Sequence, residues 1–176
     1  MDFAGLKDAI NRWSERSYDD DQLNEFIELA EANIRRRLSG YQREITTTLT
    51  TDANGQVALP SDFLGFVGVS FGDKPYRYSI SGSTLTVNDG ASRVFDVVYY
   101  GSLPSLSASN TSNWLIETAP DVYLWLVKAQ AREFNEEWEL ATGLEAKGLA
   151  ALADLNLQNT VAQYGRAGMN LPVQAI

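Results

Sequence analysis

Apolar residues recur at spacings of three and four positions twice within the first 40 residues, and this period predicts two amphipathic helices. The first apolar stripe joins Phe3 to Trp13, and Asp2 stands directly before it as an N-cap. The second stripe joins Leu23 to Leu38 and follows three aspartates at 19–21, whose charge suits the positive N-terminal pole of a helix. Each helix needs a further surface against which to bury its stripe.

The apolar period changes from 3.6 to 2 over residues 43–100, where Thr, Val, Ile, Tyr and Phe replace Leu, Ala and Glu. This change predicts short antiparallel strands joined by tight turns such as the Asp-Ala-Asn-Gly of residues 52–55. The number and spacing of the strands indicate a meander, folded as a small sandwich or an open barrel. The expected strands are 45–51, 56–59, 66–71, 76–80, 84–87 and 94–100.

Helical spacing returns after a loop rich in Ser, Pro and Asn over residues 101–113. The sequence Thr-Ala-Pro-Asp at 118–121 predicts a helix start that resembles a capping box, with the proline inside the first turn. The stripe continues to Trp138 with a break expected near Asn135, and a last stripe joins the leucines of 140–155.

The order of these segments predicts an α+β fold: a four-helix bundle, two helices before the strands and two after, that carries an inserted antiparallel β meander or sandwich. The expected boundaries are 1–42 for the first helices, 43–101 for the β subdomain, 102–160 for the last helices and 161–176 for an extended arm.

The last segment, 161–176, has scattered apolar residues without a period and cannot form a core of its own. It is too apolar for a plain solvated tail, so we expect an arm that docks on a partner; a disordered end is the alternative. The partner-binding residues expected in or beside this arm are Tyr164, Met169, Leu171, Pro172, Val173 and Ile176.

The absence of both cysteine and histidine from the 176 residues excludes disulfides, thiolate metal sites, cysteine nucleophiles and every Ser-His-Asp triad. The three aspartates at 19–21 lack the spacing of a calcium-binding loop, and helix capping is the favoured interpretation. The glutamates of 133–139 have no nucleophile beside them and indicate a solvated helix junction rather than acid–base catalysis. We therefore expect no enzyme, no catalytic residue, no metal and no cofactor.

The charge balance, 23 acidic against 14 basic residues for a net −9, disfavours a protein that wraps nucleic acid by neutralising phosphates. The longest apolar stretch, 122–127, falls far short of the ~20 residues that a membrane span requires. Residues 1–20 show no basic-then-apolar signal pattern, so a soluble protein made in a cytoplasm is expected.

Three consecutive arginines, Arg35, Arg36 and Arg37, form the most basic point of this acidic chain. Adjacent helical positions point about 100° apart, so they favour dipole matching and ion pairs within the chain or at a subunit interface over DNA contact. Trp114 in the long loop is expected to be exposed and is a second candidate for such an interface. The tryptophans, mostly at helical core spacing, are otherwise predicted to pack in the bundle: Trp13, Trp114, Trp125 and Trp138.

The succession of local motifs resembles the head-to-tail adaptor (connector or head-completion) proteins of tailed bacteriophages. The opening INRWSERSYDDDQLNEFIELAEANIRRRL is similar to the family's aromatic-then-arginine stretch and the helix after it. VALPSDFLGF resembles the family's step into its sheet, and VVYYGSLPSLSASNTSNWLIETAPDVYLW resembles its paired-tyrosine strand, Pro-x-Leu loop, Asn-Trp-Leu turn and Pro-Asp-x-Tyr-Leu helix start. Together these motifs cover most of residues 6–127.

The resemblance implies a structural protein of the virion neck, assembled in the host cytoplasm. It implies a homo-oligomeric ring, dodecameric in the family, that binds beneath the portal protein and offers a platform to a tail or nozzle protein. Genomic DNA would pass through the lumen without specific binding, which agrees with an acidic wall because that wall repels phosphate. An interface that closes a ring also requires two unlike, complementary faces on each subunit.

Two other functions remain open at this stage. The first is another neck or tail component of similar architecture, such as a stopper or a tail-tube initiator. The second is a carboxylate-dependent hydrolase, which would need two acids at a fixed separation in a cleft.

Overall fold

The computed structural model describes residues 1–38, 43–71, 74–88 and 92–166. The chain divides into two compact units, which are treated separately below. The helical unit comprises Met1–Gly40 and Leu103–Ile176, and the β unit comprises Tyr41–Ser102. The α+β class and the antiparallel sheets predicted from the sequence are confirmed.

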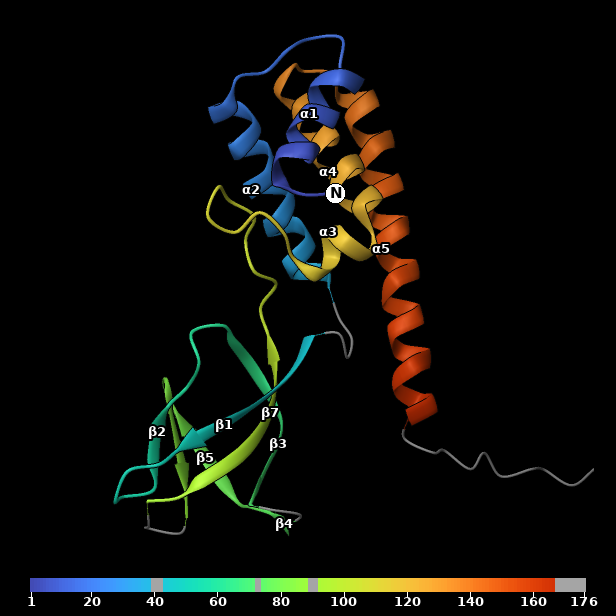
Figure 1. Cartoon of the computed structure of the whole chain (residues 1–176). Helices are drawn as coiled ribbons and strands as arrows, with labels where there is room; N and C mark the ends of the chain where they lie inside the picture. The colour runs from blue at the N-terminus through green and yellow to red at the C-terminus, as the bar shows by residue number, and fades with distance from the viewer. Residues whose placement is uncertain (39–42, 72–73, 89–91, 167–176) are drawn as a thin grey trace, which may run out of the picture. The chain divides into compact units, whose positions relative to one another are not determined.

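The helical unit contains five helices in the described residues rather than the four predicted (Figure 1). They are α1 (Phe3–Trp13), α2 (Asp20–Arg37), α3 (Trp114–Thr118), α4 (Pro120–Phe134) and α5 (Trp138–Arg166). The unpredicted α3 lies at the end of the expected loop, where Asn113 accepts a hydrogen bond from the Ile116 amide and caps it. A helix of five residues is too short to show an apolar period, so the sequence carried no clear sign of it.

The first two helices begin where the sequence predicts. The Asp2 carboxylate accepts the Gly5 amide at 2.8 Å and starts α1. Asp19 and Gln22 form a reciprocal capping box at the start of α2, in which each side chain accepts the other residue's amide. The expected capping box of α4 is wrong, because its N-cap is Ala119 and no side chain caps it; Pro120 does occupy the first turn.

The long helix α5 corrects the boundary predicted for the arm. Residues 161–166 are helical and continue α5 through Arg166, whereas an extended segment was expected from residue 161. Helix propagation adds one hydrogen bond per residue, and the sequence after Leu155 offers no glycine before Gly165 to interrupt it. The remaining arm residues, Met169 to Ile176, lie outside the described residues, as does the side chain of Tyr164.

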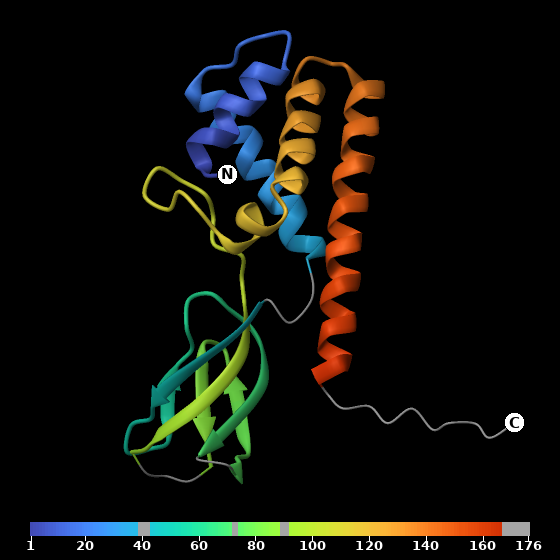
Figure 2. The same cartoon turned by 45° about the vertical axis from the view of Figure 1, so that its right-hand side comes forward.

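The core of the helical unit is built from the stripes of all its helices. The antiparallel pair α4 and α5 runs side by side in both views (Figures 1 and 2), and α2 packs against α4. Tyr123, Leu126 and Val127 of α4 are almost completely buried, as are Leu6 and Ile10 of α1. Helix α4 is therefore the central helix, since it contacts α1, α2, α3 and α5.

The β unit consists of two antiparallel sheets around a small core of its own. Its strands are β1 (Glu44–Thr50), β2 (Gln56–Ala58), β3 (Phe63–Phe71), β4 (Lys74–Pro75), β5 (Tyr78–Ser81), β6 (Thr84–Val87) and β7 (Val94–Gly101). The sheet orders are β1-β7-β3-β4 and β2-β6-β5, so the first sheet is not a simple meander. Strand β7 takes the central place because its alternate residues Phe95, Val97 and Tyr99 are all buried.

Candidate interaction site

A buried carboxylate on α2 organises the most polar part of the helical unit. Glu31 is 2% exposed, although its helix neighbours Glu25 and Glu28 are exposed. One Glu31 oxygen accepts a charge-assisted hydrogen bond from Arg35, one turn later, at 2.7 Å. A buried carboxylate is stable only when hydrogen-bond donors of the protein replace its hydrating water, and Arg35 is one such donor to Glu31.

The second oxygen of Glu31 ties α2 to the segment that precedes α3 and to α4. It accepts the Leu106 amide at 2.8 Å and the Tyr123 hydroxyl at 3.1 Å. Asn113 donates in turn to the Tyr123 hydroxyl and to the Pro104 carbonyl, both at 2.8 Å. Burial and the charge of Glu31 raise the pKa of the Tyr123 phenol, so Tyr123 stays protonated as the donor of this network.

Arg35 extends the network to the same segment. Its guanidinium donates to the Ser105 hydroxyl at 2.6 Å and to the Leu103 carbonyl at 3.3 Å. Residues 103–113 form no regular element but are therefore held against α2 at several points. The network fixes an otherwise irregular segment to the helices.

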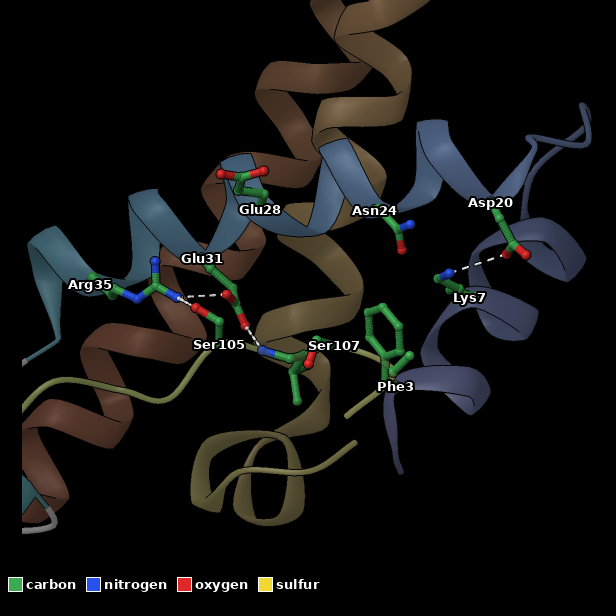
Figure 3. A pocket seen from close by; sticks show the side chains of 11 residues that line it. Phe3, Lys7, Asp20, Asn24, Glu28, Glu31, Arg35, Ser105 and Ser107 are labelled. Atoms are coloured by element: carbon green, nitrogen blue, oxygen red, sulfur yellow. Dashed lines mark hydrogen bonds and ion pairs between the residues drawn. The ribbon is translucent and has the colours of Figure 1, made fainter. Parts of the chain in front are cut away.

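A groove of about 560 Å³ opens beside this network, between α1, α2 and residues 105–108. Figure 3 shows Glu31 between Arg35 and the 105–107 segment, with Lys7 and Asp20 paired at the other end of the groove. Both oxygens of Glu31 are occupied by its own chain, which favours a structural role over general acid–base catalysis. No group of three or more acidic side chains within the described part of the chain is placed to hold a metal ion.

The three arginines singled out by the sequence have different environments. Arg35 is half-buried and bonded within its own chain, which is the ion-pair interpretation of this run. The Arg36 and Arg37 side chains are exposed in the last turn of α2. Contact with a neighbouring subunit or with DNA stays a prediction for all three.

The expectation that Trp114 is an exposed loop residue is wrong. It is the first residue of α3 rather than a loop residue, and it is partly buried against the helical core instead of exposed. The Asn113 cap fixes its position, since α3 starts at the residue after that cap.

The junction of α4 and α5 agrees with the predicted solvated helix junction: Glu133, Glu136 and Glu139 are exposed, and Glu137 pairs with Arg132.

Sequence reasoning missed a second feature, here called the cation–aromatic strip: Trp13, Trp125, Lys128 and Lys147. The two indoles lie 5.9 Å apart, Lys128 lies over Trp13 and Lys147 lies over Trp125. Trp13 is 48% exposed, so the prediction that it packs in the bundle is wrong; Trp138, at 59%, is a second such case. Helical spacing alone could not separate core tryptophans from those at the edge of a stripe.

The model of the family described as SU10 adaptor protein matches residues 1–172. No curated protein matches the chain. In the part of the chain that the structure describes, every helix is too short or too polar to cross a lipid bilayer.

Proposed function

Because the chain belongs to the SU10 adaptor protein family, a family of structural phage adaptors, we propose that it joins the portal to the tail as a ring-forming neck protein. The observation that carries the proposal is the family match over residues 1–172, which spans both compact units. Membership of the family makes this chain a bacteriophage adaptor protein, a virion component that associates with other virion components.

The electrostatics of the chain support a role around DNA rather than on it. A net charge of −9 per chain makes a ring of such subunits strongly negative overall, and we infer that its wall is negative too. A negative wall repels phosphate and lets the genome slide, whereas a basic wall would retain it by releasing counterions. The buried Glu31 has intrachain partners on both oxygens, which favours a structural role for this carboxylate.

The segment after α5 is proposed to dock on the portal protein, and the helix gives the arm a defined starting point at Arg166. The family match continues through Pro172 and so includes Met169 and Leu171. Their apolar side chains, with Val173 and Ile176, provide the contact area, and ordering the arm on the portal would set the affinity. A tail or nozzle protein is the partner proposed for the other end of the ring.

Deleting residues 167–176 is expected to remove most co-sedimentation with purified portal rings, while the full-length chain co-sediments. This deletion leaves α5 intact, unlike a cut at residue 163, so loss of binding reports on the arm alone. A chain in which Met169 and Leu171 are replaced by serine, at unchanged length, is the matched control for apolar contact and is also expected to bind weakly. Unchanged binding of the deletion variant would remove the arm from the proposal, and failure of the full-length chain to bind portal rings would contradict the proposed function itself.

A further inference from the structure

The helical unit carries two exposed surfaces of unlike chemistry. The first is the cation–aromatic strip. The second is the acidic face of α2, defined by Asp21, Glu25, Glu28 and Leu29, all exposed and within one stripe of that helix. Each surface has an apolar centre: Trp13 and Leu29 are both 48% exposed.

These two surfaces lie on opposite sides of the central helix α4. Tyr123 points toward α2, because its hydroxyl bonds to Glu31. Trp125 follows two positions later, which is about 200° around the helix, and therefore points away from α2. The acidic face is on the side of α2 that points away from α4, since Phe26, Ile27 and Ala30 occupy the side of α2 that faces the core.

The strip brings together two lysines, from α4 and α5, on a chain of net negative charge. Burial, followed by the charges of Arg132 and Lys147, lowers the pKa of Lys128. Glu137 pairs with Arg132, whereas Lys128 and Lys147 are held over the indole rings. A carboxylate-bearing surface with an exposed aliphatic residue matches the strip in charge and in apolar content.

We propose that the strip of one subunit binds the acidic face of α2 of a second copy of this chain. The pairing is heterologous, because the two faces differ and lie on opposite sides of the unit, and such contacts repeated by rotation close a ring. Trp13 and Trp125 meet Leu29, and Lys147 meets Glu25 at the rim. This inference rests on the proposed function and names the surfaces that would join its subunits.

The cysteine-free sequence allows a direct test by thiol cross-linking of the full-length chain. The variant Glu25→Cys/Lys147→Cys, treated with a short bismaleimide alone and on portal rings, is expected to give a ladder of multimers in denaturing gels. Each single-cysteine variant is expected to stop at trace dimers. The control pair Ser109→Cys/Leu157→Cys, exposed but outside both faces, is expected to give at least about fivefold less product because specific pairing excludes it.

A charge exchange adds a readout that a merely structural role would not give. Lys147→Glu and Glu25→Lys are each expected to reduce assembly onto portal rings by at least about threefold, and the double variant is expected to restore it. If the wild-type chain assembles on portal rings, three results would overturn this pairing and leave the proposed function standing. They are a face-pair product no greater than that of the control pair, efficient dimers from Lys147→Cys alone, and no rescue by the double charge variant. Absence of any wild-type assembly on portal rings would instead contradict the proposed function.

Discussion

Replacing Glu31 by alanine is expected to lower the free energy of unfolding of the helical unit by about 3 kcal/mol. The substitution leaves the Arg35 guanidinium without its carboxylate and the Leu106 amide and Tyr123 hydroxyl without their acceptor. Part of the Arg35 charge reaches solvent, since its side chain is 31% exposed, and this keeps the loss at the lower end of the range for broken buried ion pairs.

Tryptophan fluorescence during urea unfolding measures this effect selectively, because all four tryptophans belong to the helical unit. The matched control is Glu28→Ala, an exposed glutamate one turn earlier on α2, for which a change within about 0.5 kcal/mol is expected. Equal losses for the two variants would show that Glu31 does not hold residues 103–113 against α2.

Two glycines of α5 are expected to respond to alanine in opposite directions. A Cβ atom at Gly148 would lie 2.6 Å from Leu126 Cγ and 3.3 Å from the Leu126 backbone nitrogen, so α4 and α5 would have to separate. The overpacking cost of about 1–3 kcal/mol exceeds the gain in helix propensity of about 1 kcal/mol. Gly148→Ala should therefore lower the free energy of unfolding by up to about 2 kcal/mol.

Gly143→Ala is the matched variant on the same helix. A Cβ atom there meets nothing within 4 Å, so alanine adds only its higher helix propensity. The free energy of unfolding should rise by up to about 1 kcal/mol. Thermal unfolding followed by circular dichroism at 222 nm separates the two outcomes. A stabilising Gly148→Ala would mean that α4 and α5 do not pack as closely at this point as the structure has them.

The parts of the fold that the sequence predicted are those determined locally. The starts of α1 and α2 follow from aspartates that accept hydrogen bonds from amides three residues later, and the strand zone follows from its residue types. Helix α3 and the length of α5 were missed, because a five-residue helix shows no period and a helix can propagate without one.

The buried network could not be predicted from the sequence. Glu31 is one of three glutamates on α2, and nothing local separates it from the exposed Glu25 and Glu28. Its partners Leu106 and Tyr123 lie 75 and 92 positions away and are brought to it by tertiary packing. The cation–aromatic strip is of the same kind, since it joins α1, α4 and α5.

The most direct test of the proposed adaptor role is the mass of the purified full-length chain, measured by native mass spectrometry alone and after mixing with portal rings. We expect one defined complex that contains a fixed number of these 19.4 kDa chains per portal ring, in line with ring symmetry. A chain that leaves the portal mass unchanged at every concentration would contradict this role.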